Sequence, residues 1–96
     1  MRIVVNHLTF EQPPTQDVID VAHAAGQELV DAGGLAFHLV RVDETHLMLV
    51  LFFPDLETEE RITREIGGPL MREHILPLLS EPTRRSSGEA IVSRGF

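Results

Sequence analysis

LMLVLFF spans Leu47–Phe53 and is the longest unbroken apolar run of the chain. A short apolar run that ends at a proline, here Pro54, is typical of a β-strand. Side chains alternate between the two faces of a strand, so this strand presents apolar groups to both faces of its sheet. A chain of 96 residues has helices enough to cover one face. We therefore expect a second copy to cover the other face, in an obligate homodimer.

The composition limits both the size and the partners of the protein. We expect one domain over residues 1–96, near the size at which folding buries about 60–65% of the unfolded chain's surface. The formal charge of −7 argues against nucleic acid and against anionic membranes as partners. No apolar run approaches the length of a membrane span, and the segment after Arg2 does not read as a signal peptide. Cytoplasm is the expected location.

Missing residue types narrow the chemistry further. The chain has no Cys, Tyr or Trp, and its basic residues are all Arg. A disulfide, a thiolate nucleophile and a sulfur metal ligand are therefore excluded. Without Lys, Schiff-base catalysis and P-loop phosphate binding are excluded as well. The side chains left for chemistry are His, Asn, Arg, Ser, Thr and carboxylates.

The order of elements predicts an α+β fold. Helical periodicity begins after Thr15, and a second helical region begins at Asp55 and is expected to break at Gly67-Gly68-Pro69. Ser80–Gly88 reads as a polar loop. Strands are expected at Arg2–Phe10, Leu35–Val42, His46–Phe53 and Glu89–Phe96. This β-α-β-β-α-β order is the ferredoxin-like split βαβ arrangement, a four-stranded antiparallel sheet with helices on one face and the first and third strands central.

Asn6 is the first candidate site residue. It is a polar side chain among Val4, Leu8 and Phe10 on one face of the first strand. An amide in an apolar cleft is typical of a ligand site, where it hydrogen-bonds a substrate or an oxygen-derived species. The alternative is a buried amide that bonds to local backbone.

His74 is the second candidate. It lies at the edge of the apolar stripe of the second helical region, next to Ile75. Its imidazole is suited to act as a base or as a substrate contact. The alternative is a half-buried ring that caps the core. Because the predicted topology places the first strand beneath this helix, we take Asn6 and His74 together as the catalytic candidates.

For the other charged and imidazole side chains, structural or surface roles are favoured over catalytic ones. His38 and His46 bracket the predicted hairpin, whose simplest register sets His38 opposite Leu51. No metal site is expected, since a zinc site needs three or four converging ligands. His7, on the far face, is expected to pack or to form a pH-sensitive contact at the dimer seam.

Arg41 and Arg94 could hold an anionic ligand or pair across the dimer, with surface ion pairs favoured. An exposed helix face is expected for the carboxylates Glu57, Glu59, Glu60, Glu65 and Glu73.

The length, strand order and two-sided third strand resemble the dimeric α+β barrel proteins, and within them the antibiotic biosynthesis monooxygenase-like domains. The resemblance covers nearly the whole chain and rests on this pattern. It implies that two sheets pack face to face as a dimeric barrel. It also implies a cleft in each subunit between its own sheet and helices, suited to a hydrophobic small molecule.

The chain also resembles, more weakly, the small haem-degrading monooxygenases of bacteria. Their first strand carries an Asn in a context similar to VNHLTF at Val5–Phe10, and a His in a place similar to His74 ligates the haem iron. Those enzymes use a Trp on the helix before that His, and this chain has none. The resemblance therefore implies His74 as the residue for binding haem, while an activity without any cofactor is expected first.

Three functions follow from these patterns. The first is a small monooxygenase that acts on an aromatic or polycyclic molecule, with Asn6 and His74 orienting it and moving a proton. The second is a non-catalytic dimer that binds a small ligand or haem in the same cleft. The third is a structural or regulatory dimer without a ligand. RNA recognition is the weakest reading, because strand aromatics and positive charge are missing.

Overall fold

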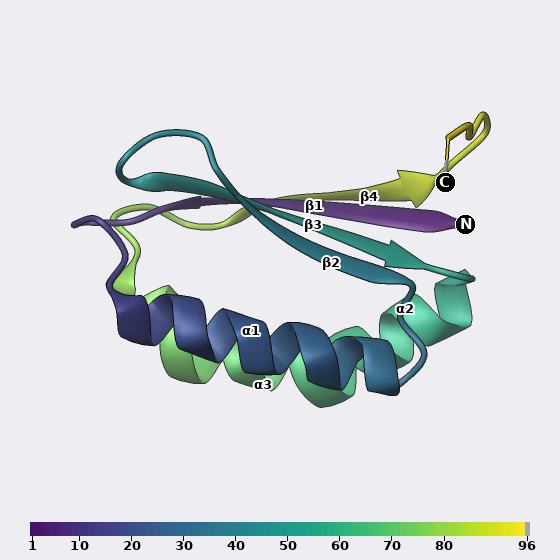
Figure 1. Cartoon of the computed structure of the whole chain (residues 1–96), viewed down its shortest axis with the longest axis horizontal. Coiled ribbons are helices and arrows are strands. Elements are labelled where there is room, and N and C mark those ends of the chain that lie inside the picture. Colours follow the sequence, from purple (N-terminus) through teal and green to yellow (C-terminus); the bar gives the residue numbers. More distant parts are fainter. Residues whose placement is uncertain (96) are drawn as a thin grey trace.

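The sheet forms one layer and the helices form the other (Figure 1). The computed structural model describes residues 1–95. The strands are β1 (Arg2–Thr9), β2 (Ala36–Arg41), β3 (His46–Phe53) and β4 (Arg84–Glu89). All pairings are antiparallel and the strand order is β2-β3-β1-β4, so the first and third strands are central. The predicted ferredoxin-like α+β fold is confirmed.

Helical backbone runs without a break from Leu56 to Leu78. After α1 (Gln16–Asp31), the second helical region consists of α2 (Leu56–Ile62), a π-helical turn (Thr63–Gly67), α3 (Gly68–Leu70), a second π-helical turn (Met71–Ile75) and a 3₁₀ turn (Leu76–Leu78). The predicted break at the two glycines is wrong, since Gly67 and Gly68 have helical φ angles of −64° and −60°. The π turn before Pro69 changes the hydrogen-bond spacing where this residue has no N–H to donate. Within the described residues, no helix has the length and apolar character needed to cross a membrane.

The last strand is formed by a polar segment. β4 pairs with β1 through its backbone, within the predicted loop Ser80–Gly88. The predicted strand Glu89–Phe96 is wrong, since β4 ends at Glu89 and residues 90–95 form no strand. Residue 96 lies outside the described residues. An edge strand that is held by backbone hydrogen bonds does not need apolar side chains, so its sequence lacked the expected alternation.

The core lies between the sheet and the helices. Val4, Leu8 and Asn6 point to the helical side of β1, as the alternation predicts, and all three are buried. Phe53 of β3 is fully buried. The remaining core side chains are Phe10, which follows β1, and residues of β3, α1 and the second helical region: Leu47, Leu49, Leu51, Val18, Leu29, Ile62 and Ile75.

The opposite face of the sheet carries no helix (Figure 1). We call this the open face, and its larger apolar side chains are Ile3, Val5, Val40, Met48, Val50 and Phe52. His7 and His46 also lie there, and a hydrogen bond of 3.1 Å joins Nδ1 of His7 to Nε2 of His46. The apolar strip predicted from Leu47–Phe53 is therefore present on both sides of β3.

The connection between β2 and β3 is a tight turn at residues 43–45. Thr45 and His46 donate their backbone N–H groups to the Asp43 carboxylate at 3.0 and 2.8 Å. These two hydrogen bonds stabilise the charged form and lower the pKa of Asp43. The turn sets His38 opposite Val50, so the register expected from the sequence, opposite Leu51, is wrong by one residue. His38 consequently lies on the open face.

Gly33 ends α1 in a conformation that favours glycine. Its φ is +115°, in the region where a Cβ is strained. We expect Gly33→Ala to lower the free energy of unfolding by about 1 kcal/mol and Tm by about 4–8 °C. Gly88→Ala is the control, because a Cβ there meets nothing within 4 Å. Thermal denaturation followed by circular dichroism checks both, and equal effects would contradict this account.

Candidate functional site

The predicted cleft is present as a cavity of about 250 Å³ under β1, β3 and β4. We call it the Asn6 cavity. Its roof is the helical side of the sheet and its floor is the π-helical part of the second helical region, where Gly67 and Gly68 line it. Its apolar walls come from Val4, Leu49, Leu51, Met71 and Leu76.

The Asn6 cavity contains polar groups without protein partners. Asn6 is 8% exposed, and within residues 1–95 its side-chain amide forms no hydrogen bond. Thr83 also lines the cavity, and its hydroxyl is buried without any hydrogen-bond partner. Buried polar groups in proteins are almost always paired, so unpaired ones in a cavity indicate a site for a bound polar atom.

Arg85 adds a positive charge to this cavity. It is the register partner of Asn6 on β4, so both side chains lie on the helical side of the sheet. Its Nη2 donates to Oε2 of Glu59 at 3.3 Å, and Arg2 donates from Nε to Oε1 at 2.9 Å. The Glu59 side chain is only 4% exposed. The buried carboxylate therefore fixes the guanidinium at the edge of the cavity.

His74 lies apart from the Asn6 cavity. Its side chain is 43% exposed, and its Nε2 is 3.9 Å from the Glu73 carboxylate. It is not among the residues that line the cavity. The structure thus places Asn6 on the helical side of the sheet, as expected, but His74 does not line the same cavity.

The sequence did not indicate Thr83, Arg85 or Glu59. Thr83 and Arg85 fall in the segment read as a loop, because pattern alone does not reveal a polar edge strand. Glu59 was expected on an exposed helix face and is in fact buried. The signal that could have revealed it is its spacing from Ile62 and Ile66, which places it on the apolar stripe of the helix.

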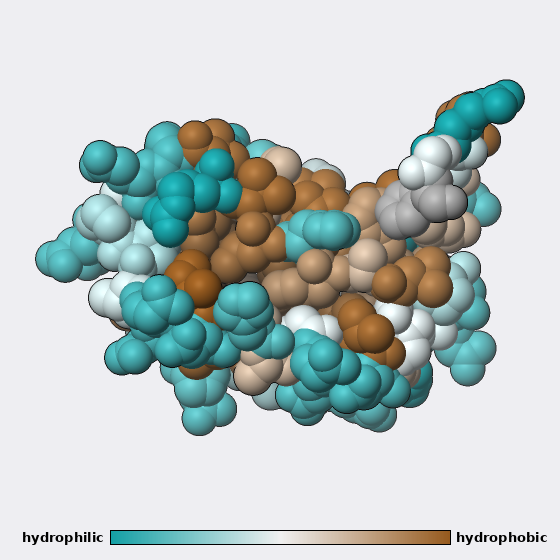
Figure 2. Space-filling view, in the orientation of Figure 1, coloured by the Kyte–Doolittle hydropathy of each residue, from teal (hydrophilic) through white to brown (hydrophobic). Residues whose placement is uncertain are grey.

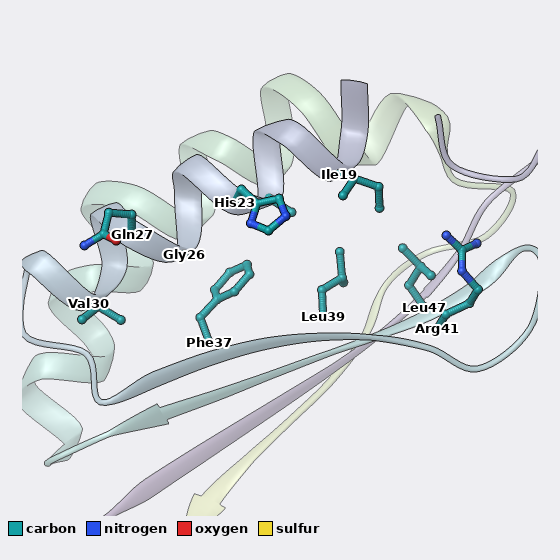
Figure 3. A pocket seen from close by; sticks show the side chains of 10 residues that line it. Ile19, His23, Gly26, Gln27, Val30, Phe37, Leu39, Arg41 and Leu47 are labelled. Atoms are coloured by element: carbon teal, nitrogen blue, oxygen red, sulfur yellow. The ribbon is translucent and has the colours of Figure 1, made fainter. Parts of the chain in front are cut away.

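A second, larger pocket lies between α1 and the edge strand β2 (Figure 3). We call it the α1–β2 pocket, and its volume is about 480 Å³. Phe37 and Leu39 point from β2 toward α1, His23 projects from α1 above them, and Arg41 lies beside Leu47 at the hairpin end (Figure 3). Figure 2 shows an apolar band on this side of the molecule, bordered by the polar residues of α1. The sequence did not indicate this pocket.

The imidazoles and carboxylates do not gather into a metal-binding cluster. Across residues 1–95, no group of three or more His, Asp or Glu side chains is placed to hold a metal ion. His7 and His46 form a pair on the open face, while His38 stacks edge-on against Phe52 with ring centroids 5.8 Å apart.

Known structures resemble the chain over nearly its full length, although no protein-family model and no curated protein sequence matches it. SnoaB, a cofactor-independent oxygenase from Streptomyces nogalater, aligns with a TM-score of 0.79 at 14% identity and covers 96% of this chain and 94% of its own. Rv0793 from Mycobacterium tuberculosis aligns with a TM-score of 0.76 at 12% identity, covering 99% and 100%.

Two further structures extend the comparison. A protein described as an antibiotic biosynthesis monooxygenase aligns with a TM-score of 0.67 at 18% identity, over 96% of this chain and all of its own. A MhuD variant with two manganese protoporphyrin IX molecules bound per active site aligns with a TM-score of 0.64 at 14% identity, over 100% of both chains. At these identities the likeness establishes the fold alone. The chain has the antibiotic biosynthesis monooxygenase-like fold.

Proposed function

We propose that the protein binds a small, largely apolar ring compound in the Asn6 cavity and oxygenates it. The observation that carries this proposal is a largely apolar cavity that is lined by two residues with unpaired polar groups, the Asn6 amide and the buried Thr83 hydroxyl. A cavity that is apolar apart from a few convergent polar groups is the usual make-up of a ligand site. The likeness in fold to a cofactor-independent oxygenase supports the same reading.

The polar groups around the cavity are suited to bind an oxyanion. Asn6 and Thr83 supply neutral donors, and Arg85 supplies a positive charge. The described residues that line the cavity include no carboxylate or imidazole. We infer that these donors stabilise the enolate or phenolate form of an acidic ring compound, which is the electron-rich form that reacts with O₂. His74, which we keep as the proposed proton carrier, would then exchange protons from outside the cavity wall.

A substrate with an activated CH₂ group supplies all the electrons that such a reaction needs. The balance is R₂CH₂ + O₂ → R₂C=O + H₂O: one oxygen atom enters the substrate, and the other leaves as water with the two hydrogens of the CH₂ group. The apolar walls exclude bulk water from the reacting carbon. No added reductant or metal is required by this stoichiometry.

Haem is a poorer fit to the residues present. Pockets that enclose drug-sized ligands measure roughly 300–1,000 Å³, so a cavity of about 250 Å³ suits a small ring compound better than a large macrocycle such as haem. The imidazole of His74, the ligand that the haem-degrading enzymes suggest, does not line the cavity. Haem therefore has no part in the proposed reaction. A Soret shift on addition of haem that His74→Ala abolishes would favour the non-catalytic haem-binding alternative.

We further propose that two copies pack through the open face. Six apolar side chains there are partly exposed in the single chain, with Val40 the most exposed at 39%. A continuous apolar sheet face is typical of a covered interface. This packing would leave the Asn6 cavity accessible, since the cavity lies on the helical side of the sheet.

Thr83→Val tests the proposed site directly. Valine has nearly the same shape as threonine, and the lost hydroxyl has no partner, so the free energy of unfolding is expected to stay the same or to rise. Oxygen uptake with anthrone, an acidic three-ring ketone with an activated CH₂, is expected to fall about tenfold. Asn6→Leu is expected to lower the rate about 100-fold, the effect of removing one oxyanion donor.

Ser93→Ala is the matched control, because it removes an exposed hydroxyl outside the cavity. Unchanged oxygen uptake in both cavity variants would show that the cavity is not the site of reaction. No oxygen uptake by the native protein with anthrone or with related activated ketones would overturn the oxygenase proposal itself.

A further inference from the structure

The α1–β2 pocket is separate from the Asn6 cavity. A void of only about 30 Å³ lies between them, bounded by Leu39 and Leu47 on one side and by Leu49 and Met71 on the other. This is about the share of liquid volume that one water molecule takes. The two pockets have no lining residue in common, so the α1–β2 pocket needs its own explanation.

Gly26 shapes the closed side of this pocket. A Cβ at this position would lie 2.8 Å from Cδ1 of Phe37, closer than real Cβ contacts come. The glycine therefore lets the ring of Phe37 lie against the backbone of α1. The ring closes the gap between helix and strand and leaves an apolar surface along Phe37 and Leu39, open to one side (Figure 3).

Arg41 supplies an uncompensated charge at the hairpin end of the same pocket. It lies on the helical side of β2, opposite the buried Leu47. The chain carries 15 acidic residues, yet within residues 1–95 Arg41 forms no ion pair and no hydrogen bond. Arg2 and Arg85, by contrast, share a carboxylate. A guanidinium without a partner at the end of an apolar surface favours an anion that carries an apolar body.

We infer that the α1–β2 pocket binds an amphiphilic carboxylate. Its carboxylate pairs with Arg41 at the exposed mouth, and its apolar body lies along Phe37 and Leu39 beneath α1. The volume of about 480 Å³ is within the range of small-molecule pockets. His23, which has no partner within the described chain, supplies a further donor from the α1 wall. The site is independent of the reaction proposed for the Asn6 cavity.

Titration with naphthoate and with its uncharged analogue naphthamide tests the inference, with binding followed by amide chemical shifts. In the native protein, naphthoate is expected to shift the amide signals of Gly26 and Leu39 and to bind more tightly than naphthamide. Arg41→Gln is expected to weaken naphthoate binding about tenfold and to leave naphthamide binding unchanged. Arg72→Gln is the control, since Arg72 is exposed, forms no ion pair in the described chain and lies outside this pocket.

Three results would overturn the inference. The first is no binding of naphthoate at millimolar concentration. The second is equal binding of naphthoate by the native protein and by Arg41→Gln. The third is a set of shifted signals confined to the Asn6 cavity, which would assign the ligand to the other site. Asn6→Leu should leave naphthoate binding unchanged, so failure of the proposed oxygenase function does not affect this test.

Discussion

Val50→Arg is expected to convert the proposed dimer to a monomer. Val50 lies on the central strand β3, between Val5 of β1 and His38 of β2 on the open face. A two-fold interface would place this substitution in both copies, so each dimer would bury two unpaired guanidinium groups. Burying an unpaired charge costs several kcal/mol per ion, which exceeds what an interface of ordinary size can absorb.

Sedimentation equilibrium at micromolar concentration measures this change as a fall from twice the chain mass to 10.7 kDa. The control is Glu57→Arg, which introduces the same side chain on an exposed part of α2 and should leave the dimer intact. A native protein that sediments as a monomer would refute the proposed assembly. It would also mean that no second copy covers the apolar side chains of β3 on the open face.

Arg2→Met is expected to lower the free energy of unfolding by about 2 kcal/mol. The substitution keeps most of the apolar stem but removes the closer of the two guanidinium groups from the Glu59 carboxylate. Arg85 remains as a partner at 3.3 Å, so the loss is smaller than the roughly 3–5 kcal/mol of a buried charge that loses its only partner. For a domain of this size, the expected fall in Tm is about 8–16 °C.

Arg64→Met is the matched control, because the Arg64 side chain is 70% exposed and its nearest carboxylate oxygen, on Glu65, lies 3.9 Å away. Its expected effect is below about 1 kcal/mol. The double variant Arg2→Met/Glu59→Leu should recover much of the lost stability, because it replaces the buried ion pair by apolar contacts. Equal destabilisation by Arg2→Met and Arg64→Met would show that Glu59 does not depend on its pairing with Arg2.

Most of the sheet could be predicted from its apolar pattern. Alternation assigned the faces of β1 correctly, and the strand expected at His46–Phe53 has the same bounds as β3. The one-residue error in the register of β2 against β3 comes from the turn at residues 43–45. The other two errors lie where backbone hydrogen bonding outweighs side-chain pattern. β4 is a polar edge strand, and the helical region continues through Gly67 and Gly68 by means of π turns.

The candidate site was predictable only in part. Asn6 was identified because a polar residue on an apolar face is visible in the sequence. Arg85 and Thr83 were not, because Arg85 lies on β4 and Thr83 directly precedes this strand, which is far along the chain from its partner β1. The α1–β2 pocket depends on how closely Gly26 lets the helix approach Phe37, which is a distance that no pattern of residue types encodes.

The polar character of β4 also determines how the molecule can associate. Every residue from Arg84 to Glu89 is exposed, and the strand carries two arginines at the outer rim of the sheet. Charged rims discourage the addition of further strands from other molecules. Sideways growth into ribbons or fibrils is therefore disfavoured at this rim, whereas the proposed packing of two copies through the open face would form a closed pair.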